Sequence, residues 1–290
     1  MKRTTTGEKI FTVCNYILMV LLVFVTIYPI WYVAIASFSS GEAVSTGKVM
    51  FWIKDFTYEA YDQVFKTKYL LSSYLNTIYY AVVSTLLSMF LTTTAAFGLS
   101  RKDFPFKKGI SLFFMFTMWF GAGIMPTYLN VRNLGLLDNR LGIILMGAVS
   151  TWNLILMRSF FDSIPTEMDE SAKLDGANDW VLFKSIYLPL SGAAIATISL
   201  YYFVSSWNSY FWSMLIFTDE TKIPLQVILK KLIVELNINF SETAGIDYTS
   251  TSRETTVFAT IMISIVPMMI LYPFVQKYFV KGIMIGAVKG

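Results

Sequence analysis

The segment ESAKLDGAND, residues 170–179, is the most polar stretch between two long apolar runs of this chain. Within it, the carboxylates of Glu170 and Asp175 stand among four small residues: Ser171, Ala172, Gly176 and Ala177. Carboxylates accept hydrogen bonds from the backbone amides or arginines of another protein, and small side chains let a second backbone approach closely. The pattern favours a docking surface. An ordinary solvated loop is the alternative, with Glu170 or Asp169 paired to Lys173 along one helix.

Residues that could perform covalent chemistry are scarce. The 290-residue chain has one cysteine, Cys14, and no histidine. That composition excludes intrachain disulfides, the common histidine-containing metal sites and any imidazole-dependent triad. The pair Gly47-Lys48 is not part of a phosphate-binding loop, because Glu42 replaces the first glycine and Val49 replaces the Ser or Thr that would bind Mg²⁺. We therefore expect no catalytic residue, no metal and no enzyme activity in this chain.

Two short helices are expected to present the polar segment. Ser163 is the expected N-cap of the first, with Pro165 in its first turn. Asp175-Gly176 supplies its end, where glycine adopts a positive φ. Asn178 or Asp179 is expected to cap the second helix.

The remainder of the chain is typical of a membrane protein. It is 55% hydrophobic with a mean hydropathy of +0.57, and six runs contain no charged residue: 10–41, 69–100, 109–131, 141–157, 185–218 and 255–276. About 20 apolar residues cross a bilayer as one helix. The prediction is an all-α integral membrane protein with six transmembrane helices and a single domain over residues 1–290.

Lysine and arginine indicate the orientation of these spans. Three lie before the first run, four in the loop 101–108 and three after Gln276. Because short cytoplasmic loops are rich in these residues, both termini and the polar loop 158–189 are expected in the cytoplasm. The loops 42–68 and 219–254 then lie outside. The net charge of +4, without a dense basic run, argues against nucleic-acid binding.

One motif is specific enough to suggest a family. Glu170-Ser171-Ala172, two residues, Asp175-Gly176-Ala177, then Phe183, Ile186 and Leu188-Pro189 resemble the EAA loop of bacterial ABC importer permeases. With WNSYFW (207–212) and the terminal KGIMIGAVKG, the whole chain resembles the carbohydrate branch, which includes the smaller maltose permease subunit and complex-polysaccharide permeases. Ser171 replaces the family's alanine, and Gly192 stands where many members have proline.

The resemblance implies the type I permease fold in the bacterial cell membrane. It also implies that the loop is a coupling helix, which sits in a groove of a cytoplasmic ATPase. Residues 170–172 and 175–177 would make that contact, and Gly286, Lys289 and Gly290 of the tail are candidates for a second one. The implied partners are a second permease chain, two ATPase subunits that bind ATP and Mg, and an extracytoplasmic solute-binding protein. The implied substrate is a carbohydrate, and the family branch favours an oligosaccharide.

A sugar would need aromatic faces and hydrogen-bonding groups within the spans. The candidates for the substrate pathway are Asn153, Tyr202, Trp207, Asn208, Phe211 and Trp212. Interhelical packing for the asparagines, and an interfacial aromatic belt for the Trp and Tyr residues, are the alternatives. Similarly, the amphipathic segment 225–236 either packs across the outer mouth or lies on lipid.

Two other classes of protein, an ion-coupled secondary transporter and a membrane enzyme, are alternatives to an importer permease. An ion-coupled secondary transporter usually holds an ionisable residue within the bilayer, and all six runs lack one, although sodium sites built from carbonyls and hydroxyls need none. A membrane enzyme would need an unusual surface site, because histidine is absent and the acidic residues lie in loops. Both alternatives fit the sequence less well than an importer permease.

Overall fold

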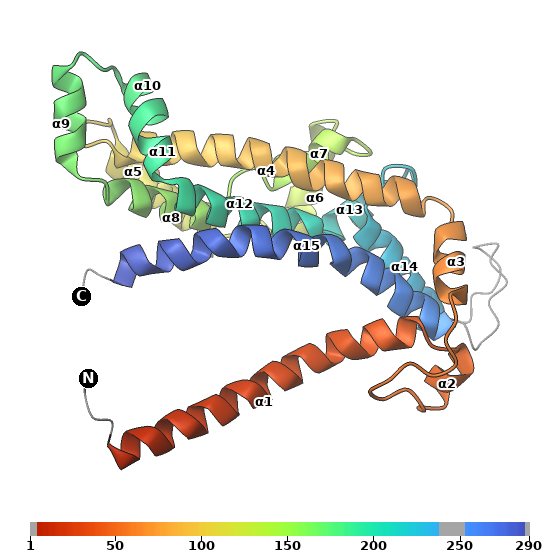
Figure 1. The fold of residues 1–290 in the computed structure, drawn as a ribbon. Helices are drawn as coiled ribbons and strands as arrows, with labels where there is room; N and C mark the ends of the chain where they lie inside the picture. Colours follow the sequence, from red (N-terminus) through yellow and green to blue (C-terminus); the bar gives the residue numbers. More distant parts are fainter. Residues whose placement is uncertain (1–4, 238–252, 288–290) are drawn as a thin grey trace. The chain divides into compact units, whose positions relative to one another are not determined.

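The computed structural model describes residues 5–237 and 253–287, and every regular element in these residues is helical (Figure 1). The elements are α1 (Thr6–Ser37), α2 (Gly41–Ser45), α3 (Glu59–Lys66), α4 (Leu70–Ser100), α5 (Lys107–Trp119), α6 (Ile124–Asn133), α7 (Arg140–Met146), α8 (Thr151–Asp162), α9 (Thr166–Leu174), α10 (Asp179–Leu182), the π-helix η1 (Phe183–Tyr187), α11 (Leu188–Leu190), α12 (Gly192–Trp207), α13 (Phe211–Ile216), α14 (Leu225–Asn237) and α15 (Arg253–Ala287). The all-α prediction is confirmed.

The described residues contain three helices that are long and apolar enough to cross a membrane: Thr6–Ser37, Leu70–Ser100 and Arg253–Pro273. Three bent helix pairs also pass that test when each pair is taken together. They are α5 with α6, bent by 117°, α7 with α8, bent by 52°, and the α10-to-α11 segment with α12, bent by 81°. The chain thus has up to six spans, in agreement with the predicted six-helix permease fold.

The chain groups into two compact units, residues 1–70 with 229–267 and residues 71–228 with 268–290. We refer to them as the first and second units. The organisation of residues 1–290 as one permease domain stays a prediction.

In the first unit, α1 begins with a capping box. The Thr5 amide donates to Glu8 Oε2 at 2.7 Å, and the Glu8 amide donates to Thr5 Oγ1 at 3.4 Å. These bonds satisfy two amides at the N-terminus of the helix. Most of α1 is apolar and exposed in the isolated chain, as expected for a helix that contacts lipid or another membrane protein.

The end of α1 folds onto its following loop. Ile35 and Ala36 form a small buried cluster with Ala43, Val44 and Val49. Beside this cluster, the Ser39 hydroxyl donates to the Ile35 carbonyl at 2.7 Å and accepts from the Lys54 amide at 3.1 Å. The predicted loop 42–68 is therefore ordered around α2 and α3.

The second unit has a larger core, formed where α4, α8, η1 and α12 meet. Four rings form what we call the aromatic cluster: Phe97, Phe161, Phe183 and Tyr187. Their centroids lie 5.1 to 6.4 Å apart in mostly tilted or edge-to-face pairs, the geometry that the ring quadrupoles favour. This cluster fixes the ends of α4 and α8 beside η1.

The π-helix has a simple cause. Pro189 carries no amide hydrogen, so the helix cannot form its regular bond at that position. The preceding amide of Leu188 instead donates five residues back, to the Phe183 carbonyl. Single π-turns of this type are frequent at functional sites, and this one connects the polar loop to α12.

Candidate functional site

The polar loop forms helix α9, which stands out from the core. None of its nine residues is buried, and Figure 1 shows it beside α10, at the end of the second unit where α4 finishes. The sequence-based prediction of its N-cap is wrong. Ser163 instead ends α8, where its amide and hydroxyl both donate to the Phe160 carbonyl. Pro165 is the residue that precedes α9.

The end of α9 is the predicted glycine stop. Gly176 has φ +84°, and its amide donates to the Lys173 carbonyl at 3.0 Å, while the Ala177 amide donates to the Ala172 carbonyl at 2.9 Å. These two bonds form a Schellman motif, which satisfies carbonyls that the helix end leaves open. The motif requires a residue in the left-handed conformation, so glycine at position 176 is explained by local geometry.

Of the two predicted caps, Asn178 and Asp179, Asn178 is the one that caps the second loop helix. Its Oδ1 accepts the Val181 amide at 2.9 Å. The Schellman motif and this cap lie only two residues apart, so the chain reverses direction over a short and well-defined turn. α9 is thereby held at a fixed angle to α10.

The six motif residues are accessible. Glu170, Ser171, Asp175 and Gly176 are exposed, and Ala172 and Ala177 are half-buried. Asp169, which the sequence allowed to pair with Lys173, bonds elsewhere: its Oδ2 lies 2.5 Å from Arg101 Nη1. The motif surface is thus open while α9 is tied to the loop after α4.

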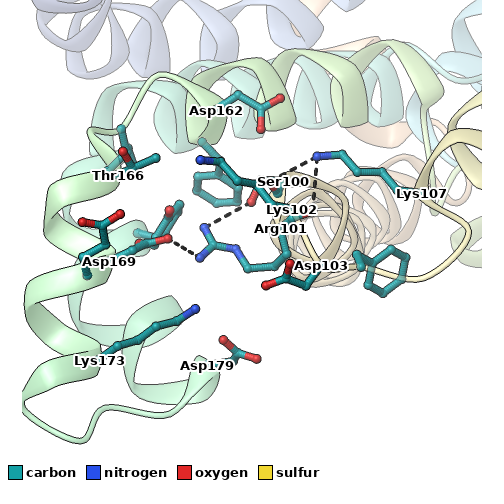
Figure 2. A pocket seen from close by; sticks show the side chains of 15 residues that line it. Ser100, Arg101, Lys102, Asp103, Lys107, Asp162, Thr166, Asp169, Lys173 and Asp179 are labelled. Carbon is teal, nitrogen blue, oxygen red and sulfur yellow. Dashed lines mark hydrogen bonds and ion pairs between the residues drawn. The ribbon is translucent and has the colours of Figure 1, made fainter.

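A polar cleft of about 510 Å³ lies beneath α9, with basic and acidic side chains facing one another (Figure 2). Its charged lining is Arg101, Lys102, Asp103, Lys107, Asp162, Asp169, Glu170, Lys173 and Asp179. Lys107 Nζ donates at 3.3 Å to the Ser100 and Arg101 carbonyls. Carbonyls at the end of a helix such as α4 have no partner within the helix, so the lysine satisfies them. The cleft lies between the polar loop 158–189 and the short basic loop 101–108.

Sequence reasoning missed Arg101 as a site residue. It used the loop RKDFPFKK only for orientation, whereas Arg101 contacts Asp169, 68 residues away. Its only sequence signal is an arginine directly after a long span, and nothing in that signal points to Asp169. Burial lowers the pKa of the Arg101 guanidinium, but hydrogen bonds and charge interactions with Tyr187 and Asp169 raise it by more than burial lowers it. The pKa of Arg101 therefore lies above its ordinary value. Arg101 therefore stays charged.

The candidates for the substrate pathway divide into two groups. Tyr202, Asn153 and Trp207 are buried. The Tyr202 hydroxyl bonds Thr92 Oγ1 at 2.7 Å and accepts the Ser150 amide at 3.0 Å, so it links α4, α12 and the start of α8. Trp207 stacks on Phe203 and meets Tyr74 edge-on. In this conformation Tyr202 and Trp207 contact other side chains of the second unit.

The other three candidates lie at the break between α12 and α13. Asn208 ends α12, Phe211 begins α13, and both are exposed, while Trp212 is half-buried. An interrupted helix inside a bilayer needs partners for its open backbone groups or a cavity to line. The break therefore places an amide and two aromatic rings where a polar ligand could be contacted.

The proposed tail contact falls mostly outside the described residues. Gly286 belongs to α15, whereas Lys289 and Gly290 lie beyond the described range.

The segment 225–236 is helical, as expected, and its first turn is anchored in the second unit, because the Leu225 amide donates to Thr77 Oγ1 at 2.8 Å. Leu225, Val227 and Ile228 are buried, which favours packing over exposure to lipid for this turn.

A second charged cluster ties two other loops together, and we call it the loop clasp: Asp138, Asp219 and Lys222. Lys222 Nζ lies 2.8 Å from Asp138 Oδ2 and 3.4 Å from Asp219 Oδ2. Asp138 Oδ1 also accepts the Thr218 and Asp219 amides. The bond to Lys222 and these amides lower the pKa of Asp138, and the bond to Asp138 raises the pKa of Lys222.

These pKa shifts predict a pH-dependent stabilisation. The contribution of Asp138 is present above its unfolded pKa of about 4 and is lost as the pH falls through its lower folded pKa. That of Lys222 is present below about pH 10.4 and is lost above its raised folded pKa. We expect Asp138→Asn to lower the melting temperature of the purified protein by a constant amount between about pH 5 and pH 9. The difference should shrink below about pH 4.

Asparagine suits this test because it keeps the amide-accepting oxygen and tolerates the left-handed backbone of Asp138, φ +50°. Asp55, with φ +48° and no ion pair among the described residues, provides the control. Asp55→Asn should melt like the wild type at every pH. An equal melting temperature for Asp138→Asn and wild type at pH 7 would contradict the assigned role of the clasp.

The fold and the site define a class of protein. Up to six apolar spans and the exposed polar helix α9 define a multi-pass membrane protein. Among the described residues, no group of three His, Cys, Asp or Glu side chains could hold a metal. The family model described as "Binding-protein-dependent transport system inner membrane component" matches residues 66–285. The chain belongs to this family, and is thus a non-enzymatic permease subunit of an ABC transporter.

Individual relatives cover nearly the whole chain. The polygalacturonan/rhamnogalacturonan transport system permease protein YtcP of Bacillus subtilis is 37% identical over 98% of this chain and 99% of its own length. Protein LplC of the same organism is 35% identical over 99% and 97%. A chain in the crystal structure of a bacterial ABC transporter involved in import of the acidic polysaccharide alginate is 42% identical, with a TM-score of 0.88 over 96% of this chain and 100% of that one.

Proposed function

We propose that this chain is a permease subunit that imports an oligosaccharide by alternating access, driven by ATP hydrolysis on separate subunits. The observation that carries the proposal is α9, an exposed polar helix that ends in a rigid Schellman turn and bears the motif residues 170–172 and 175–177. A membrane chain without a nucleotide-binding loop needs such a surface to receive work from an ATPase. The curated relatives, named as carbohydrate permeases, support the substrate class.

The proposed assembly has five kinds of component. This chain pairs with a second, different permease chain, and two ATPase subunits that bind ATP and Mg dock on the cytoplasmic side, one of them against α9. A solute-binding protein delivers the carbohydrate at the outer loops, 42–68 and 219–254. The exposed apolar surfaces of α1 and α5 support contact with lipid and with the second permease.

The proposed orientation places both termini and α9 in the cytoplasm. Its support is the excess of Lys and Arg before α1, in the loop 101–108 and after Gln276. The tail residues Gly286, Lys289 and Gly290 would then lie on the same side as the ATPases. The substitution Thr6→Cys, in a Cys14→Ser background, should accordingly react with a membrane-impermeant maleimide only in inside-out vesicles.

The substrate pathway is proposed at the break between α12 and α13. Asn208 offers an amide for sugar hydroxyls, and Phe211 and Trp212 offer faces for stacking. We propose that Tyr202 and Trp207, which are buried on α12, support this break, and Asn153 is a further buried candidate on α8. Tyr202 is the best defined of these supports because its hydroxyl bonds both Thr92 and Ser150.

The decisive experiment measures ATPase activity of this chain in nanodiscs with its partner permease and ATPase subunits. The binding protein is added empty or loaded with oligogalacturonate, oligoalginate or a maltodextrin. We expect one loaded form to stimulate hydrolysis, which would identify the sugar and its charge class. If no ATPase associates in nanodiscs, and uptake into proteoliposomes that contain this chain collapses with an ionophore, the alternative of an ion-coupled secondary transporter replaces this proposal.

A further inference from the structure

Arg101 occupies the junction between α4 and the docking loop. It follows Ser100, the last residue of α4, and its Nη1 lies 2.5 Å from Asp169 Oδ2 on α9. Both side chains are only 16% exposed. A charge-assisted bond in such a sheltered position is stronger than one on an open surface, because water competes less for the two groups.

The guanidinium is also held from a second side. It lies over the rings of Phe97, at 4.6 Å, and Tyr187, at 4.4 Å, both members of the aromatic cluster. A planar guanidinium stacks on rings while its edge bonds a carboxylate, which the compact ammonium of lysine does less well. Arg101 thus has one rigid contact with the core and one with α9.

The docking helix has few other means of fixing its position. None of its residues is buried, so apolar packing holds it weakly. The Schellman turn sets its angle to α10, and the bond between Arg101 and Asp169 ties it to the end of α4, a span of 31 residues. A displacement of α9 therefore has a direct route to α4, and through the aromatic cluster to α8 and η1.

We propose that Arg101 is a positioning residue that transmits the movement of α9 to α4 through its bond with Asp169. This role rests on the proposed docking of α9 to an ATPase. Asp169 precedes the motif and points into the cleft (Figure 2), whose lining includes Glu170 but no other motif residue. The pair therefore belongs to the internal side of the loop, and five of the six motif residues lie outside the cleft, where we propose that the ATPase contacts them.

The test compares four variants in the reconstituted complex with ATPase subunits and binding protein: R101Q, D169N, the double variant and the control R158Q. The readout is sugar taken up per ATP hydrolysed, measured on complexes shown to contain the ATPase. We expect R101Q and D169N each to lower this ratio about tenfold, a typical size for coupling between sites, with the ATPase still bound.

The double variant distinguishes two explanations for uncoupling: loss of the link between α9 and α4, and the cost of leaving one sheltered charge unpaired. Each single variant leaves one sheltered charge without its partner, whereas the double variant removes both charges. If the link transmits movement, the double variant stays as uncoupled as either single one. If the single variants fail only because a charge is left unpaired, the double variant regains coupling, which would overturn the proposal.

The control removes a different arginine of the same unit. Arg158 bonds Ser111 Oγ at 2.8 Å and pairs with Asp162 within α8, so it makes no link to α9. R158Q should keep the wild-type ratio. A wild-type complex that lacks the ATPase would refute the docking of α9 itself, whereas a coupled R101Q complex would refute only the role of Arg101.

Discussion

Replacing Gly176 with proline should leave the chain in the membrane and abolish ATP-dependent uptake. Gly176 has φ +84°, whereas the proline ring fixes φ near −65°. Proline would also remove the amide that donates to the Lys173 carbonyl. Both bonds of the Schellman motif depend on this residue, so α9 would lose its end and its angle to α10. Because the change lies outside the spans, insertion should be unaffected.

The measurement is uptake of labelled sugar into proteoliposomes that contain the complete transporter, with equal amounts of membrane-inserted chain. We expect a loss of at least about tenfold. Gly176→Ala should show a smaller loss, because a left-handed non-glycine residue costs roughly 1–2 kcal/mol. Gly192→Ala is the matched control, since a Cβ there meets nothing within 4 Å. Normal uptake by Gly176→Pro would refute the docking role of this loop.

Local chemistry explains which features the sequence could predict. Gly176 and Asn178 were predictable because a left-handed turn and a side-chain cap are decided by adjacent residues. The charge-free runs gave the number of spans because the membrane requires apolar sequence of a certain length. Ser163 was assigned to the wrong helix, because a serine between two helices can end the first or begin the second.

The bends within the spans were not predictable from hydrophobicity. The run 185–218 contains the end of η1 and all of α11, α12 and α13, and it holds no charged residue at any of the breaks between them. Gly123, with φ +84°, lies at the bend between α5 and α6, but a glycine in an apolar run need not produce a bend. Such breaks depend on partners that the rest of the fold supplies.

Contacts between distant segments account for the rest of the site. Arg101 meets Asp169, and Tyr202 meets Thr92, 110 residues earlier in the chain. No local pattern announces either bond. The sequence predicted Tyr202 as a candidate for the substrate pathway because it is an aromatic residue with a polar hydroxyl in a span. Its two hydrogen bonds in the fold indicate the supporting role that we propose for it.

Phe161→Ala should be the most destabilising substitution in the aromatic cluster. Its side chain is 1% exposed, and its ring meets Tyr187 at 5.4 Å and Phe97 at 6.4 Å. Truncation of a buried phenylalanine leaves a cavity and costs roughly 3–5 kcal/mol. We expect a correspondingly lower unfolding midpoint in detergent. Phe113→Ala, whose side chain is 65% exposed, is the matched control and should unfold like the wild type.

The same substitution also bears on transmission through the loop. The Arg101 guanidinium rests on Phe97 and Tyr187, and Phe161 packs against both rings from α8. Loss of the Phe161 ring should therefore loosen the support of Arg101 as well as the core. We expect Phe161→Ala to lower uptake per ATP at a temperature where the protein is still folded. A destabilised variant with the wild-type ratio would show that the cluster contributes to stability alone.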